Sequence, residues 1–125
     1  MEPEGMDRET LREALREELR ASGRFSEVEE VEVAPGPERS KLVASGHRVR
    51  ITFAPTVRVS DPERFTTTIR GRFEEVFPAV RVEETAYEDP EPAAGLVEEE
   101  RLRIRPARGP TVILTVSGLR DRLSG

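Results

Sequence analysis

Proline and glycine recur at short intervals along this chain, which limits it to short helices and strands. Its 125 residues include ten prolines and nine glycines. Proline cannot donate a backbone hydrogen bond, so it ends or bends the helix or strand that it interrupts. Between these breaks, no apolar run approaches the roughly 18 residues of a membrane-spanning helix. The spacing of these residues therefore predicts several short helices and strands. A chain of this length has room for one core, so we expect a single domain.

Two segments repeat apolar residues at the three- and four-residue spacing of an amphipathic helix. These residues are Leu11, Ala14, Leu15 and Leu19 in the first segment and Phe65, Ile69, Phe73, Val76 and Phe77 in the second. The first helix is predicted to begin at a cap on Asp7 or Thr10. The second is predicted to begin at 60–63, where a capping side chain precedes a proline, and to end at Pro78. The β-branched run 66–68 leaves a strand open as the alternative for this second segment.

The remaining segments alternate apolar and polar residues, as strands with one buried face do. They lie around Val31 and Val33, from about Lys41 to Val59, from Val80 to Tyr87, from Leu102 to Ile104 and from Thr111 to Ser117. Pro55 must bend the second of these or divide it into two strands. We expect 80–87 and 101–105 to form a hairpin with one charged face, across a loop that runs through Gly95. Segment 111–117 has apolar groups on both faces, which predicts the central strand.

Together these elements predict an α+β fold: a mostly antiparallel sheet of about five strands with two helices packed on one face. We expect a flexible N-terminus over residues 1–6, a single domain over 7–118 and a C-terminal tail over 119–125. The N-terminus is acidic, where a signal peptide would be basic and then apolar, so no targeting segment is expected.

Side chains that could carry chemistry are few. The chain has no cysteine and one histidine, His47, which excludes disulfides, thiol nucleophiles and two-histidine metal sites within one chain. His47 shares strand parity with Val49 and Ile51, so a half-buried histidine at a strand end is favoured over a general base. No glycine-rich turn joins a strand to a helix, as a phosphate-binding loop would. We therefore expect no enzyme, no cofactor and no metal site.

Glutamates offer the remaining catalytic alternative. Six of them flank the expected hairpin: Glu83, Glu84, Glu88, Glu98, Glu99 and Glu100. A pair of acids could serve hydrolysis, and a cluster could bind a divalent cation. A catalytic pair normally has one member in an apolar cleft that raises its pKa, whereas arginines surround this run. A solvated charged face is the favoured interpretation, and a small enzyme that uses a carboxylate ranks third among the functions considered.

Arginines carry the most functional content. Five of them project, by strand parity, from faces opposite the expected core: Arg48, Arg50, Arg101, Arg103 and Arg105. The simplest interpretation is a solvated face, and a protein–protein interface is the leading functional one. The glutamates expected to pair across strands with these arginines are Glu30, Glu32, Glu83 and Glu99. Nucleic acid is disfavoured, because the net charge is −5 and five phenylalanines and one tyrosine leave no stacking platform.

The order of elements also resembles that of known assembly proteins. A helix start at Asp61-Pro62-Glu63 follows a long strand, and a hairpin is expected near the C-terminus. In this order the chain looks like the small tail-terminator and head–tail joining proteins of tailed phages, which form rings. It is similar also to acidic secretion chaperones of α/β type, which act as dimers. The likeness covers most of the chain but lies in the order of elements rather than in a motif, so no residue is carried over.

We therefore expect a non-enzymatic structural or assembly protein that acts through homo-oligomeric contacts, with a phage-like tail or head–tail joining component as the best match. The alternative is an acidic chaperone or an interaction module that binds a peptide along a sheet edge. The expected partners are other protein subunits rather than nucleic acid or a membrane. The expected location is the cytoplasm or a virion.

Overall fold

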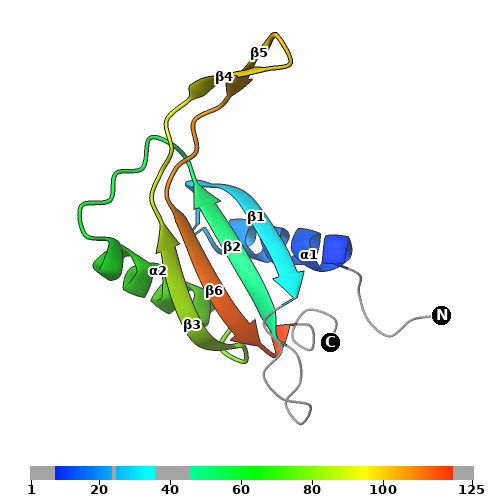
Figure 1. Ribbon diagram of the computed structural model, residues 1–125. Helices are drawn as coiled ribbons and strands as arrows, with labels where there is room; N and C mark the ends of the chain where they lie inside the picture. Colours follow the sequence, from blue (N-terminus) through cyan, green and yellow to red (C-terminus); the bar gives the residue numbers. More distant parts are fainter. Residues whose placement is uncertain (1–7, 24, 36–45, 120–125) are drawn as a thin grey trace, which may run out of the picture.

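A four-stranded antiparallel sheet with two helices on one face forms the body of the protein, and a separate two-stranded hairpin projects from it (Figure 1). The computed structural model describes residues 8–23, 25–35 and 46–119. The elements are α1 (Arg8–Ser22), β1 (Val28–Pro35), β2 (His47–Phe53), α2 (Pro62–Val76), β3 (Arg81–Glu88), β4 (Ala94–Glu98), β5 (Arg101–Arg105) and β6 (Thr111–Ser117). The larger sheet has the order β1-β2-β6-β3, and the smaller one pairs β4 with β5. The prediction of an α+β fold with a mostly antiparallel sheet is confirmed.

The hydrophobic core lies between the larger sheet and the two helices. The sheet supplies alternate residues of its strands, which are Val31, Val33, Val49, Ile51, Phe53, Val82, Val112, Leu114 and Val116. The helices supply the stripes expected from their spacing, Leu11, Leu15 and Leu19 from α1 and Ile69 and Phe73 from α2. Leu119, just beyond β6, is fully buried as well. Burying each of these side chains contributes about 1.5–3 kcal/mol, so this layer holds the body together.

The ends of α2 follow the signals in the sequence. Asp61 is the N-cap, and its carboxylate accepts a hydrogen bond from the backbone N–H of Arg64 at 3.2 Å. Pro62 stands in the first turn, where its missing N–H is not needed. At the other end the N–H of Phe77 donates to the carbonyl of Phe73 at 2.9 Å. The helical interpretation of this segment is confirmed, because the cap and the apolar stripe outweigh its β-branched run.

The expected hairpin is wrong. Segment 80–87 does not pair with 101–105: β3 pairs with β6, and β5 pairs with β4. β4 begins within the segment expected to be a loop, where Ala94 and Gly95 have low strand propensity. The turn at 99–100 contains no glycine that would mark it in the sequence.

The extended segment around Pro55 forms a single strand in the described residues. β2 ends at Phe53, and Pro55 belongs to the connection that leads to α2. Residues 41–45 of this prediction lie outside the described part of the chain. The described residues therefore form six strands in two sheets rather than about five in one. The prediction that 111–117 is central is confirmed, since β6 lies between β2 and β3.

Neither α1 nor α2, the two helices in the described residues, has the length and apolar content that would let it cross a bilayer.

Candidate functional site

The hairpin of β4 and β5, residues 94–105, stands clear of the body, and we call it the arm (Figure 1). Its strands pair in antiparallel register from Ala94↔Arg105 to Glu98↔Arg101. None of its residues is buried, and its sheet has only two strands. An isolated two-stranded hairpin is at best marginally stable in water. The arm is therefore a candidate contact surface.

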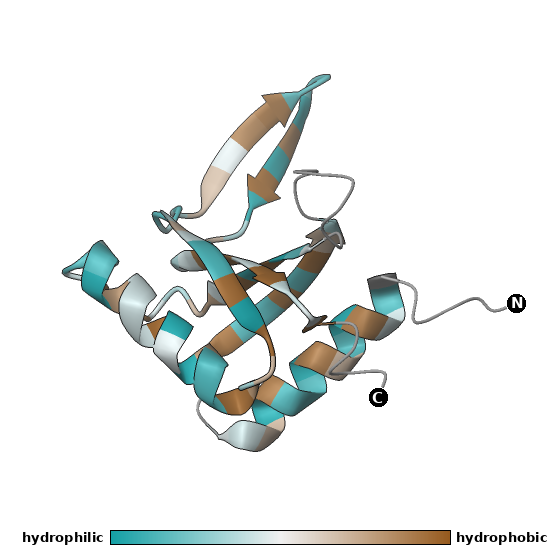
Figure 2. Cartoon of the chain, turned by 90° about the horizontal axis from the view of Figure 1, so that it is seen from below, coloured by the Kyte–Doolittle hydropathy of each residue, from teal (hydrophilic) through white to brown (hydrophobic). Residues whose placement is uncertain are grey.

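One face of the arm is apolar. The alternation of paired strands places Gly95, Val97, Leu102 and Ile104 on this face. Val97, Leu102 and Ile104 are 77%, 68% and 67% exposed, and they are the exposed large hydrophobic residues in the described part of the chain. Figure 2 shows hydrophobic bands on both strands of the projecting hairpin. A concentrated apolar patch on an otherwise charged surface is typical of a protein contact site.

The opposite face of the arm is charged. Arg101, Arg103 and Arg105 project from β5 on this side, beside Leu96 and Glu98 of β4. Nη1 of Arg103 lies 3.5 Å from Oε1 of Glu98, and both side chains are largely exposed. An exposed ion pair contributes less than about 1 kcal/mol, so it does little to hold the two strands together.

The turn at the tip of the arm does not stabilise the hairpin either. Glu99 and Glu100 have backbone φ angles of 49° and 64°, in the left-handed region. Two-residue hairpin turns of this geometry prefer asparagine and glycine, and the left-handed conformation costs other residues about 1–2 kcal/mol each. Three consecutive glutamates at the tip, 98–100, add like-charge repulsion. The order of the arm therefore depends on its base or on a contact made by its faces.

The base of the arm is joined firmly to the body. The two segments that connect the arm to β3 and β6 are paired with each other, since Glu91 and Arg108 exchange two backbone hydrogen bonds, each N–H donating to the other carbonyl at 2.8 Å. The N–H of Phe53 donates to the carbonyl of Pro110 at 2.9 Å. Between them Gly109 is buried, and a Cβ on it would overlap the carbonyl oxygen of Phe53. This close approach fixes where the arm leaves the body.

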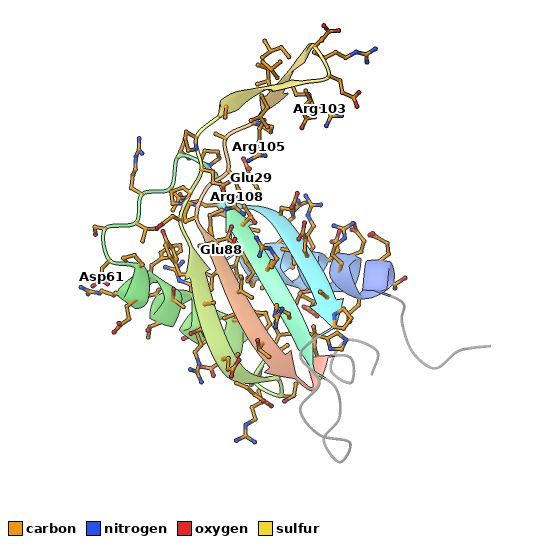
Figure 3. All side chains as sticks on the ribbon, viewed as in Figure 1. Glu29, Asp61, Glu88, Arg103, Arg105 and Arg108 are labelled. Atoms are coloured by element: carbon orange, nitrogen blue, oxygen red, sulfur yellow. The ribbon has the colours of Figure 1, made fainter. Side chains whose placement is uncertain are left out.

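Near the base of the arm, an ionic cluster crosses the face of the sheet that the helices do not cover (Figure 3). Arg50 on β2 reaches past β6 to Glu88 on β3 and donates two hydrogen bonds, Nη2 to Oε1 at 2.7 Å and Nη1 to Oε2 at 3.0 Å. Nη1 of Arg108 donates to the same Oε1 at 3.2 Å, and Nη2 of Arg108 lies 3.5 Å from Oε2 of Glu91. The hydrogen bonds from Arg50 lower the pKa of Glu88 and raise the pKa of Arg50. The cluster ties β2, β3 and the base of the arm together.

Replacing Glu88 with glutamine should lower the free energy of unfolding by about 1 kcal/mol at neutral pH, because both arginines lose their shared charge partner. The native pKa of Glu88 is lowered, so its contribution is complete at neutral pH and disappears as the pH falls through that lowered pKa. The difference between the native chain and Glu88→Gln should therefore shrink toward zero between about pH 5 and about pH 2.

Urea unfolding at several pH values measures this difference. Glu98→Gln is the matched control, since its pairing with Arg103 is exposed and should change stability by less than about 0.5 kcal/mol. A Glu88→Gln deficit that stays the same at every pH would contradict the charge-based account of the cluster.

The pKa of the Glu32 carboxyl group is raised. The cause is first a side-chain hydrogen bond with Glu30, then partial burial, and nearby Arg50 opposes both. Glu32 lines a groove of about 690 Å³ beside β1, together with Arg12 and Arg48. Its side chain is 57% exposed, and the groove places arginines as well as apolar residues around it. The environment differs from the apolar cleft expected around a catalytic acid.

The five arginines predicted as an interface are divided between the body and the arm. Arg48 and Arg50 are on β2, on the face of the body away from the helices, whereas Arg101, Arg103 and Arg105 are on the arm. Figure 3 labels Arg103 well beyond the end of the larger sheet, whereas Arg105 lies at the base of the arm, where it lines a groove with Glu29 of β1. The sequence pattern indicated that each group of arginines shares one face of a strand, but it did not predict that the second group lies on a separate hairpin.

The glutamate partners of these arginines were predicted in part. Nε of Arg50 lies 3.7 Å from Glu32, as expected, but its closest partner is Glu88. Glu88 was not predicted as a partner of Arg50, because their strands β2 and β3 lie on either side of β6, which comes last in the sequence. Arg103 pairs with Glu98, whereas the glutamate expected as a partner at this turn was Glu99.

The candidates for catalysis do not come together. His47 is the first residue of β2 and is half-buried, which matches the expected position at a strand end. Glu83 and Glu84 lie toward the start of β3, at the opposite end of the molecule from the 98–100 tip (Figure 1). Among the described residues, no group of three or more histidine, aspartate or glutamate side chains is arranged to hold a metal ion.

Comparison with protein-family models, with curated protein sequences and with solved structures found no match for this chain.

Proposed function

We propose that this chain is a non-enzymatic assembly protein that works through contacts between its own copies, and that the arm makes the principal contact. The observation that carries the proposal is the apolar face of the arm, with Val97, Leu102 and Ile104 each at least two-thirds exposed. Exposing these side chains in water is unfavourable, and covering them supplies the driving force for association.

The rest of the arm supports the same function. A hairpin with a glycine-free left-handed turn and one weak exposed ion pair gains little stability from its own contacts. Its base, in contrast, is held by backbone hydrogen bonds: Glu91 and Arg108 pair the two connecting segments with each other, and the N–H of Phe53 in β2 donates to the carbonyl of Pro110. A projecting surface that is held in position at its base suits repeated docking to an identical neighbour.

The specific assembly we propose is a phage-like tail or head–tail joining component. Its support is the order of elements, an early helix and strand pair followed by the Asp61-capped helix and a late hairpin. The arm projects beyond the body, where it can reach a neighbouring subunit, and a second, head-to-tail contact between bodies would close a ring.

A second candidate is an interaction module that binds a peptide along a sheet edge. The observation that favours it is that β1 and β3 are edge strands, with no strand of the described residues paired to their outer sides. An extended peptide could add to either edge through backbone hydrogen bonds. This candidate predicts a monomer that binds a foreign segment, which separates it from self-assembly.

Light scattering on the full chain tests the proposal. Over about 1–500 µM protein, the weight-average mass should rise from 14.1 kDa to at least twice that value, as expected for micromolar self-association. A mass that stays at 14.1 kDa over the whole range would overturn self-assembly and leave the peptide-binding module as the better account.

A further inference from the structure

We propose that two copies of this chain associate by packing the apolar faces of their arms against each other. This inference rests on the proposed self-assembly and adds to it the partner surface: the same face of a second copy. The contact is isologous: the same residues of each arm form both sides of the interface.

The first argument is where apolar surface is found. Among the described residues, the exposed large hydrophobic side chains are Val97, Leu102 and Ile104, and all three lie on one face of the arm. The described surface of the body offers no comparable patch against which this face could pack. Within an assembly of identical chains, the matching apolar surface is therefore the arm of another copy.

The second argument is charge. The apolar face carries no ionisable group, so two such faces can meet without repulsion or the desolvation of a charge. The other face carries Arg101, Arg103 and Arg105 against one glutamate, Glu98. Packing that face on its own copy would bring arginines together, which is unfavourable. Only one of the two faces of the arm suits self-packing.

The third argument is the shape of the apolar face. A Cβ built on Gly95 would lie 3.4 Å from Cδ1 of Leu102 and 4.0 Å from Cδ1 of Ile104. These two side chains therefore lean over the glycine and cover the backbone of β4. With Val97 toward the tip they make a continuous apolar surface, which can pack on a second sheet at the usual spacing of about 10 Å.

The size of the contact sets its strength. Each arm offers one face of two five-residue strands to the contact, whereas a standard stable interface uses about 20–30 residues on each side. The arm contact alone therefore forms a reversible pair that depends on concentration. Additional contacts between bodies would be needed for a permanent particle.

Single cysteines distinguish this arrangement from others, because the native chain contains none. Val97→Cys places a thiol on the apolar face, and Arg103→Cys places one on the opposite face. The two positions are a matched pair: Val97 is 77% exposed, the side chain of Arg103 is 76% exposed, and both lie within one residue of the middle of their strands. Neither change touches the core, so both variants should fold as the native chain does.

Each variant is treated with a bifunctional maleimide that spans about 10 Å, the spacing of two packed sheets. In face-to-face packing the two Val97→Cys thiols come within reach whether the arms run parallel or antiparallel. The two Arg103→Cys thiols are separated by the thickness of both hairpins. We expect at least five times more covalent dimer from Val97→Cys than from Arg103→Cys at equal protein concentration.

Equal or greater cross-linking of Arg103→Cys would overturn the proposal. So would the absence of covalent dimer from both variants, as expected if a different protein covers the apolar face. Light scattering on the same samples separates this failure from failure of the proposed function. An oligomer that does not cross-link through position 97 keeps self-assembly and rejects the arm contact, whereas a monomer rejects both.

Discussion

Replacing Gly109 with alanine should lower the free energy of unfolding by more than about 3 kcal/mol. Gly109 is buried where the chain enters β6 from the arm, and a Cβ there would overlap the carbonyl oxygens of Phe53 and Ala54. Both obstacles are backbone atoms, which cannot rotate away as the end of a side chain can. The chain must shift, and the shift would break the hydrogen bond from the N–H of Phe53 to the carbonyl of Pro110.

Gly71→Ala provides the matched control for this substitution. Gly71 lies inside α2, and a Cβ on it would meet nothing within 4 Å. Alanine is the better helix former, so this change should raise stability by about 0.5–1 kcal/mol. Urea unfolding followed by circular dichroism measures both variants. A Gly109→Ala protein within about 1 kcal/mol of the native chain would show that the base of the arm is not the tight junction described above.

The body of the fold could be predicted from the sequence because its signals are local. The stripe through Phe65, Ile69 and Phe73, with the Asp61 cap before it, specifies α2 within one segment. The apolar run of β6 indicates its central position without knowledge of its neighbours. Such features depend on residues a few positions apart, and the structure confirms them.

Features that depend on long-range pairing could not be predicted in the same way. Glu88 lies 38 residues from Arg50, and the two meet only because β6 returns between their strands. The pairing of β4 with β5 was hidden by a glycine in the strand and by a turn without one. Neither the ion pair of Arg50 with Glu88 nor the pairing of β4 with β5 can be recognised from the alternation of residues within one segment.

The candidate site shows a further limit of alternation. Leu102 and Ile104 alternate with arginines as a strand with a buried face would, and the arginines were therefore placed opposite an expected core. In the structure these two side chains are the exposed ones, and no core lies beneath them. A two-residue period identifies which residues share a face, but it does not say whether that face meets the same chain, another copy or water.

Substituting the three apolar residues of the arm with threonine should weaken self-association at least about 100-fold. The variant Val97→Thr/Leu102→Thr/Ile104→Thr loses apolar surface in each of two copies, at about 0.5–1 kcal/mol per side chain, or about 3–6 kcal/mol per pair. Threonine is β-branched, as residues favoured in strands often are, so the substitutions should not disfavour the strands. Because all three positions are exposed in the single chain, the stability of the body should change by less than about 0.5 kcal/mol.

The charged face provides the comparison. Arg101→Gln/Arg103→Gln/Arg105→Gln leaves the apolar surface intact and removes three exposed charges. Charges at the rim of an interface tune its affinity and its salt dependence more than they drive it. This variant should therefore weaken association by at most about tenfold and reduce its sensitivity to salt.

The most direct test is the dissociation constant for self-association, measured by sedimentation equilibrium for the native chain and these two variants side by side. The arm-mediated account predicts that the threonine variant loses association by at least about 100-fold, well beyond the loss in the glutamine variant. A threonine variant that assembles as tightly as the native chain would contradict it.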